Sequence, residues 1–436
     1  MSTRTSRVLR WLLVLIVVVA AALFAYVWKP ALDPVQVQDE NFSDEMIVRG
    51  KSVAAIGSCV VCHTAADGPA NAGGRAMDTP FGTIYSTNIT PDAETGIGQW
   101  SFEAFDRAMR RGVARDGTYL YPAFPYTYYT RLSAEDMEAL YAFLMTEPPI
   151  HAQPPETELP FPLNIRPLMA GWNLLFLDRS PLETVPEESE LWNRGHYLAQ
   201  GAGHCAACHS PRNALGAEKE GRHYLAGGET EGWLAPALNH DSPAPVAWTE
   251  EALFNYLRHG FDQQHGAAVG SMSPVVRVGT SQIPESDTRA LATYFASQAR
   301  DPESVGGDDA ETVAREAVAS YTPAVTEGAR LFGSACLVCH HAGDGPESFG
   351  VQPQLWFSTS LHLDEPDNVV RYVLDGVQQP ASADLGYMPP FRHSLNDQQI
   401  AVLVNYMRTR FAQKPEWEGL QDEVERIRHE VPQSRY

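Results

Sequence analysis

The sequence predicts an all-α protein in which three tandem domains follow one N-terminal transmembrane helix. Three observations predict this fold: an apolar run near the N-terminus, a threefold repeat of glycine, cysteine and helical patterns, and the lack of convincing period-two segments typical of strands. The chain has 436 residues, and single hydrophobic cores rarely grow past about 250–300 residues, so several domains are expected. A hydrophobic fraction of 44% supports packed cores and excludes wholesale disorder.

The first element is an apolar segment within residues 1–30. Three arginines precede an uncharged run from Trp11 to Trp28; as a helix this run would reach about 27 Å, close to the roughly 30 Å of a membrane hydrocarbon core. Basic residues ahead of the run place the N-terminus in the cytoplasm, so we expect an anchor in the cell inner membrane with the remaining chain on the periplasmic side. The alternative is a signal peptide cleaved near Ala20 to Ala22, where small residues cluster.

The six cysteines form three pairs, and a histidine directly follows each pair. The motifs read CVVCH, CAACH and CLVCH, the attachment motif of c-type haem, in which each thiol adds to one vinyl group and the histidine binds the iron. Disulfides or redox dithiols would not need a histidine at the same place each time, and a zinc site made from two pairs would leave the third alone. We therefore expect three covalently bound haem c groups (Fe), held by Cys59, Cys62, Cys205, Cys208, Cys336 and Cys339, with His63, His209 and His340 as proximal ligands.

The repeated pattern also sets the expected domain boundaries. Each repeat opens with a helical pattern containing a glycine and closes with an amphipathic helix, and class I cytochrome c domains close around haem by crossing such helices at a small residue. The first, second and third repeats are residues 31–147, 188–300 and 322–412, joined by a proline-rich linker (148–187) and an acidic linker (301–321), and followed by a C-terminal tail (413–436). The glycines are Gly50, Gly195 and Gly328; the closing helices are expected at 134–145, 285–298 and 397–410, with N-caps at Ser133, Ser286 and Asn396.

A third shared element lies between motif and closing helix. Helical patterns at 102–113, 252–261 and 369–377 align on Gly112, Gly260 and Gly376, and counting twelve residues on from these glycines gives Phe124, Met272 and Met388. A methionine followed closely by proline on a loop is a natural sixth iron ligand, so Met272 and Met388 are the expected distal ligands, with gap-filling core methionines as the alternative.

The first repeat departs from this pattern, because phenylalanine cannot bind iron. Met109 is the expected substitute, since it precedes Gly112 by three residues on the distal helix. Met77 and an open, five-coordinate iron are the alternatives. The remaining histidines are interpreted as surface or propionate-contacting residues, and Arg75 with the polar cluster at 85–88 as propionate donors or ordinary loop polarity.

The two linkers, the net charge and a search for catalytic motifs give further expectations. The uncharged stretch at 167–177 is too short to span a bilayer and is interpreted as a packing helix, a partner dock or an interfacial segment near quinone, whereas the acidic linker is expected to be solvated. With 32 basic and 54 acidic residues the net charge is −22, which argues against nucleic acid as a partner. No dinucleotide fingerprint, GxSxG elbow or HExxH pair occurs, so no catalytic residue for an organic substrate is expected.

Three further segments carry a family resemblance. GTIYSTNITPDAETGIGQWS, YPAFPY and RPLMAGWNLLF, together with three CxxCH motifs behind an anchor, resemble the three-haem cytochrome c subunits of membrane-bound periplasmic dehydrogenases for alcohol, gluconate, fructose or aldehyde. The resemblance implies electron transfer in a respiratory chain, from a quinoprotein, flavin or molybdenum catalytic subunit to ubiquinone. It also implies a methionine in the AFPY position, where this chain has Phe124. The alternatives are a membrane-tethered carrier that feeds a terminal oxidase or another reductase, and a haem peroxidase that uses an open first haem.

Overall fold

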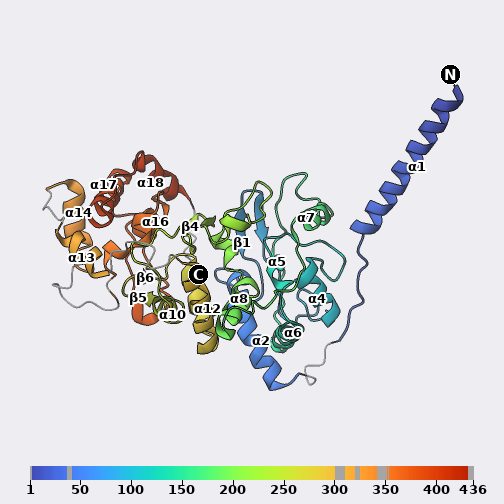
Figure 1. The fold of residues 1–436 in the computed structure, drawn as a ribbon, viewed down its shortest axis with the longest axis horizontal. Helices are drawn as coiled ribbons and strands as arrows, with labels where there is room; N and C mark the ends of the chain where they lie inside the picture. Colours follow the sequence, from blue (N-terminus) through green and yellow to red (C-terminus); the bar gives the residue numbers. More distant parts are fainter. Residues whose placement is uncertain are drawn as a thin grey trace. The chain divides into compact units, whose positions relative to one another are not determined.

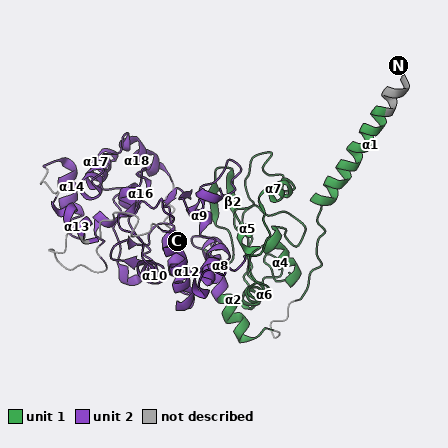
Figure 2. Ribbon diagram, in the orientation of Figure 1, with its two compact units in different colours: residues 1–51, 68–182 green, residues 52–67, 183–436 purple. Residues whose placement is uncertain are grey.

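The computed structural model describes residues 2–36, 42–299, 310–319, 325–340, 351 and 353–430. The chain divides into two compact units, which Figure 2 shows in different colours. Compact unit 1 contains residues 1–51 and 68–182, and compact unit 2 contains residues 52–67 and 183–436. The first CxxCH motif therefore groups with the second and third motifs in compact unit 2, although most of the first repeat belongs to compact unit 1.

The N-terminal apolar run forms one continuous helix, α1 (Ser2–Val27), drawn in dark blue in Figure 1. Its segment Val8–Val27 has a mean hydropathy of 2.7 and is, in the described part of the chain, the one helix long and apolar enough to cross a membrane. The chain after α1 is tied to compact unit 1, because Leu32 donates a backbone hydrogen bond to Arg115 and the Arg107 guanidinium donates to the carbonyl of Pro30.

Compact unit 1 contains one hairpin and a set of helices that pack around tyrosines. Tyr141 lies at the centre, where its ring contacts Phe102 and Phe105 and its hydroxyl donates to the carbonyl of Trp100 at 2.7 Å. The elements are α2 (Asp44–Ile56, which runs into compact unit 2), β1 (Ala76–Thr79), β2 (Gly82–Tyr85), α4 (Phe102–Arg111), α5 (Tyr126–Tyr129), α6 (Ala134–Thr146) and α7 (Leu168–Phe176).

Compact unit 2 holds the first motif, the second repeat and the third repeat. The elements up to the end of the second repeat are α3 (Cys59–Cys62), α8 (Glu190–Gln200), α9 (Ala206–His209), η2 (Gly221–His223), β3 (Gly228–Thr230), β4 (Trp233–Ala235), α10 (Glu250–His259), β5 (Phe261–Asp262), β6 (Gly266–Ala267), α11 (Met272–Pro274), the π-helical η3 (Val275–Thr280) and α12 (Glu285–Gln298). Those that follow are α13 (Ala310–Ala319), α14 (Glu327–Ala335), η4 (Leu355–Phe357), α15 (Thr359–His362), α16 (Asp367–Asp375), η5 (Ala383–Leu385), α17 (Asp397–Met407), the π-helical η6 (Arg408–Ala412) and α18 (Leu420–His429).

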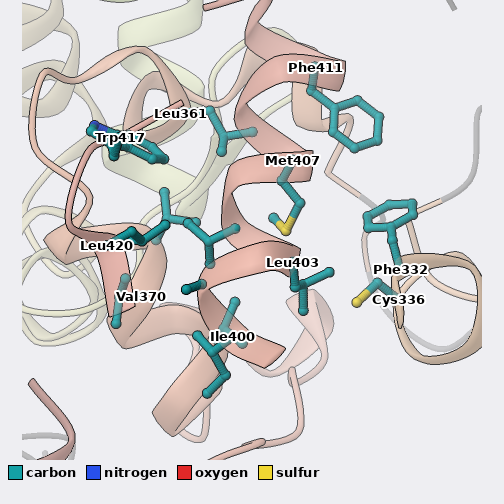
Figure 3. Packing of buried hydrophobic residues seen from close by; sticks show 14 of the residues in the cluster. Phe332, Cys336, Leu361, Val370, Ile400, Leu403, Met407, Phe411, Trp417 and Leu420 are labelled. Carbon is teal, nitrogen blue, oxygen red and sulfur yellow. The ribbon is translucent and has the colours of Figure 1, made fainter. Parts of the chain in front are cut away.

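The third repeat is organised around α17. In Figure 3, Ile400, Leu403 and Met407 project from α17 into the cluster, and Phe332 approaches from α14 with Cys336 from the residue directly after that helix. Ile400 is fully buried and Leu403 is 1% exposed, so this helix contributes the centre of the core. The first haem-attachment cysteine of the third motif is thereby part of a packed hydrophobic core.

In all three repeats the first helix crosses the last helix at the expected glycine. A Cβ on Gly50 would lie 1.9 Å from the carbonyl oxygen of Ala139, and one on Gly195 would lie 1.9 Å from that of Ala290. On Gly328 the Cβ would lie 2.4 Å from the carbonyl oxygen of Val402. Real side chains do not approach backbone this closely, so only glycine permits the crossing.

Two of the three expected N-caps are confirmed and one is wrong. The Ser133 hydroxyl accepts from the backbone of Asp136, and Asn396 forms a capping box with Gln399. Ser286 lies inside α12, whose N-cap is Pro284. Proline fixes φ near the value that the helix needs, and Glu285 and Asp287 in the first turn favour its positive end.

Four other features differ from the sequence expectations. Within the described residues three two-stranded antiparallel hairpins accompany the helices, and the turn between β3 and β4 uses Glu231 and Gly232 with φ of 50° and 74°. The acidic linker contains α13, whose Val313 and Ala314 pack against the third repeat, so this part is not simply solvated. The C-terminal tail contains α18, and the last helix of the third repeat ends at Met407 and continues as η6 instead of reaching 410 as a regular helix.

Candidate haem-attachment sites

Each CxxCH motif folds as one helical turn. The backbone N–H of the histidine donates to the carbonyl of the first cysteine at 2.9 Å in the first motif, 3.1 Å in the second and 2.9 Å in the third. All six cysteines are free thiols. One turn of helix therefore brings both thiols and the imidazole of each motif together, as covalent attachment to one porphyrin requires.

The first cysteine of each motif does not have the character of a redox-active thiol. Burial raises the pKa of Cys59 and Cys205 to about 12, and that of Cys336 to about 11. Redox-active CxxC pairs instead have lowered thiol pKa values, because the thiolate is the reactive form. The donor set fits haem attachment better than disulfide exchange.

Two proximal histidines are oriented by proline carbonyls. His209 Nδ1 donates to the carbonyl of Pro236 at 2.7 Å, and His340 Nδ1 donates to that of Pro353 at 3.2 Å. Burial lowers the pKa of both imidazoles, so they are neutral and the Nε2 lone pair is free for iron. The sequence reasoning missed both prolines, although a Pro-x-Leu pattern at 236–238 and 353–355 was the available signal.

A glycine with positive φ ends the helix before each distal loop, with ψ of 39° at Gly112, 11° at Gly260 and −164° at Gly376. Gly112, Gly260 and Gly376 end α4, α10 and α16 with φ of 60°, 76° and 66°. In the third repeat a Cβ on Gly376 would lie 2.2 Å from the carbonyl oxygen of Met388, and Met388 pairs with Val377 through two backbone hydrogen bonds. The glycine is needed because the loop folds back across the end of the helix.

The two distal methionines are both half-buried. Met388 lies on this returning loop, and Met272 opens α11 and packs against Ala268, Val276 and Ala381. Their ligation of iron stays a prediction.

In compact unit 1 the two candidate methionines of the first repeat lie on separate elements, and Phe124 lies in the turn before α5. Phe124 belongs to an aromatic group, with its ring centroid 5.4 Å from that of Tyr129 and 6.3 Å from that of Tyr126. Met109 is 6% exposed on α4, whereas Met77 is half-buried on β1 and faces Ile84 in the hairpin register. Met109 as the sixth ligand also stays a prediction.

Several other histidines have partners that explain them. His265 stacks on Trp248 and hydrogen-bonds Asp262 and the carbonyl of Val246 through its two ring nitrogens. His204 Nε2 donates to the carbonyl of Gly57 at 3.2 Å, a contact that the sequence did not indicate. His341 lies outside the described residues.

Two observations bear on propionate binding. The Trp356 side chain is in the core of the third repeat at 6% exposure, and its Nε1 has no hydrogen-bond partner in the described part of the chain. A buried indole donor of this kind fits an acidic group of a bound cofactor, since buried donors are normally paired. In the first repeat, Asn88 instead bonds Thr95 and the carbonyl of Ile150, which favours a structural role in its loop.

Comparisons with known proteins agree with this geometry. Residues 47–147 match the family model "Cytochrome c", and residues 323–407 match the model "Cytochrome C oxidase, cbb3-type, subunit III". Over 403 residues the chain is 50% identical to a nicotinate dehydrogenase subunit of Pseudomonas putida, covering 92% of this chain and 33% of that protein. The chain therefore spans about a third of the length of that relative.

Other relatives match over most of their own length. The gluconate 2-dehydrogenase cytochrome c subunit of Pantoea cypripedii is 37% identical, over 85% of this chain and 86% of the relative. The cytochrome c subunit of the quinone alcohol dehydrogenase of Gluconacetobacter polyoxogenes is 35% identical, over 86% of this chain and 83% of the relative. Attachment turns, oriented imidazoles and these relatives lead to one conclusion: the chain belongs to the family of cytochrome c subunits of membrane dehydrogenases.

Proposed function

We propose that the chain carries three haem c groups and passes electrons, one at a time, from a dehydrogenase catalytic subunit to ubiquinone in the membrane. The attachment turn, which occurs three times with a histidine one turn after its first cysteine, carries this proposal. Haem 1 would be held by Cys59, Cys62 and His63, haem 2 by Cys205, Cys208 and His209, and haem 3 by Cys336, Cys339 and His340.

The bound haems would supply one-electron exchange at iron, and the protein supplies orientation and surroundings. The carbonyls of Pro236 and Pro353 hold the imidazoles of haems 2 and 3 in one tautomer. Met272 and Met388 are the proposed sixth ligands, and thioether ligation raises the reduction potential. Met109 is the proposed sixth ligand of haem 1, because Phe124 has no donor atom.

The proposed catalytic partner is a nicotinate-type dehydrogenase. The identity to the nicotinate dehydrogenase subunit is 50%, against 34–37% for the cytochrome subunits of alcohol, fructose and gluconate dehydrogenases. The match of residues 323–407 to a cbb3-type oxidase component favours a second candidate, a tethered carrier that feeds a terminal oxidase.

Contacts inside compact unit 1 support a membrane location. The Tyr26 hydroxyl at the end of α1 donates to the carbonyl of Ala170 on α7, and Val27 packs beside Ala170. On α7, Leu174 is 70% exposed and Leu175 is 68% exposed. We propose that α1 is the anchor and that these leucines enter the periplasmic membrane surface, near the quinone, which favours the interfacial interpretation of the linker.

Purification of the full chain from native membranes in mild detergent tests the function. We expect a bound dehydrogenase subunit, three haems per chain by pyridine haemochrome assay, and haem reduction when nicotinate is added to the complex. Reduction by gluconate or ethanol instead would change the partner, whereas a chain that copurifies only with an oxidase would favour the second candidate.

A further inference from the structure

The turns that precede the first two haem-attachment motifs contact each other within compact unit 2. His204 Nε2 donates to the carbonyl of Gly57 at 3.2 Å. The contact is reciprocal, because a Cβ on Gly57 would lie 3.6 Å from the carbonyl oxygen of Ala202, and one on Gly203 would lie 3.5 Å from Cγ1 of Ile56. Gly57 stands two residues before Cys59, and Gly203 stands two residues before Cys205, so equivalent positions of the two motifs meet.

The backbones of the two turns have the same shape. Ser58 and His204, each directly before the first cysteine, have φ of 49° and 35°. The π-helical segment η3 packs on the first turn as well, since a Cβ on Gly279 would lie 3.1 Å from both the Ala55 carbonyl and the Ser58 hydroxyl. Gly57 and Ser58 are accordingly buried. The turn is enclosed by the second repeat.

We propose that His204, through its hydrogen bond to Gly57, docks the two attachment turns so that haems 1 and 2 lie with their thioether edges adjacent and exchange electrons directly. In the haem-loaded protein such an exchange would oxidise one haem and reduce the other by one electron, with no bond made or broken and no proton required. The inference rests on the proposed function only in that both motifs must carry haem. His204 is a positioning residue, since it acts through the turns and not on iron.

Burial lowers the pKa of the His204 imidazole, so its ring is neutral at neutral pH and the Nε2 proton is available for Gly57 as a single tautomer.

The test uses the haem-loaded full chain with three variants. His204→Phe keeps a ring but removes the donor, His204→Gln retains an N–H donor, and His240→Phe changes an exposed histidine whose Nε2 lies 3.5 Å from Oδ1 of its neighbour Asp241. Neighbouring haems couple their Soret transitions into a bisignate circular dichroism band, which reports their mutual orientation. We expect His204→Phe to lose the part of this band that arises from haems 1 and 2, and His204→Gln and His240→Phe to retain it.

Two further readouts separate positioning from general stability. After flash reduction, electron equilibration between haems 1 and 2 should slow in His204→Phe while the haem potentials stay unchanged. In the same variant the backbone amides of Gly57 and of residue 204 should exchange roughly tenfold faster, because the buried carbonyl of Gly57 loses its donor. An unchanged band and unchanged exchange in His204→Phe at full haem content would overturn the proposal.

A second variant acts from the other side of the contact. Gly57→Val leaves residue 204 unchanged and adds a branched side chain whose Cβ would lie 3.2 Å from the Val53 carbonyl oxygen, 3.5 Å from Sγ of Cys59 and 3.6 Å from the Ala202 carbonyl oxygen, so haem content is measured together with the band. We expect it to lose the same dichroic band, and retention of the band at full haem content would count against the docking contact even if His204→Phe failed to fold. Haem content reports on the proposed function separately, since fewer than three haems in the unmodified chain would contradict that proposal and not the docking.

Discussion

The first two haem-attachment turns and the third differ in what surrounds them. Gly57 and Gly203 face each other across a reciprocal contact, and Ser58 is buried. In the third repeat Ser334, which stands at the position of Gly57 and Gly203, is exposed, and Leu337 and Val338 within the motif are 46% and 56% exposed. The same motif thus has the same local fold in both regions but different neighbours. Attachment chemistry depends on a few residues, whereas the electronic partner of a haem depends on packing that the motif does not encode.

The two regions also differ in how their helices are held. In the first two repeats the residue before the crossing glycine is an arginine that pairs with the closing helix, Arg49 with Asp136 and Arg194 with Asp287. The third repeat has Glu327 at this place, and α18 packs on α16 and α17 instead. Arg428 of α18 bonds Asp397 at 2.6 Å. In the third repeat the ion pair to the closing helix therefore comes from the added C-terminal helix and not from the first helix.

Removal of a proximal histidine should separate the two regions most strongly. His209→Ala and His340→Ala each remove one iron ligand, so each should lose one low-spin haem signal in the electronic spectrum. Only His209→Ala should also abolish the dichroic coupling of haems 1 and 2, because only haem 2 belongs to the docked pair. If the dichroic coupling survived in His209→Ala and disappeared in His340→Ala, haem 3 and not haem 2 would be a member of the coupled pair.

The local structure of both regions could be predicted from the sequence, but the long-range contacts of these regions could not. Cys-x-x-Cys-His and the crossing glycines obey short-range rules, so the attachment turns and the helices at Gly50, Gly195 and Gly328 could be predicted. The bond between His204 and Gly57 joins residues 147 positions apart, and no local pattern marks it. The division of the first repeat between two compact units is likewise a property of contacts and not of periodicity.

Glycine substitutions should have the next largest effect. In Gly195→Ala the new Cβ would lie 1.9 Å from the Ala290 carbonyl, and such overpacking destabilises by about 3 kcal/mol. Gly333→Ala is the matched control in α14, where no atom of the described residues outside the helix's own backbone lies within 4 Å of the added Cβ. There the change should stabilise by about 0.5–1 kcal/mol, because glycine is a poor helix former. Hydrogen exchange of the amides of α8 and α14 measures the stability change in each variant. Equal changes at the two glycines would contradict the crossing geometry.

Acid should weaken the third repeat through His362. Burial, and then the charges of Lys414 and Arg408, lower the pKa of this imidazole, whose Nδ1 donates to the carbonyl of Ser358 at 2.9 Å. Its neutral form is favoured in the folded state, so the stabilisation is full above the unfolded pKa of about 6.5 and is lost as the pH falls toward the lower folded value. His362→Gln should flatten the pH dependence of α17 amide exchange between about pH 7 and about pH 5. An unaltered slope in that variant would assign the acid sensitivity to another group.

Breaking the arginine–aspartate pairs should give the smallest effect on stability. The effect should differ between the first two repeats, because the two pairs have different geometry. Arg194 binds Asp287 through two hydrogen bonds, of 2.9 Å and 2.7 Å, whereas Arg49 binds Asp136 through Nε alone at 2.6 Å and reaches Glu135 at 3.3 Å. Bidentate pairs are stronger than single contacts, and partly exposed pairs contribute little, so Arg194→Met should cost about 1 kcal/mol and Arg49→Met about 0.5 kcal/mol.

Hydrogen exchange of the first helix of each repeat measures this difference, with Arg330→Met in the third repeat as the control. Arg330 bonds the carbonyl of Val325 on its own side of the crossing, so its loss should leave the contact between α14 and α17 unchanged. Raising the salt concentration should reduce the cost of both pair-breaking variants, because the pairs are partly exposed and screened. Salt-independent losses would mean that the arginines act through the packing of their methylene stems, and the third repeat would then differ from the first two in packing and not in charge.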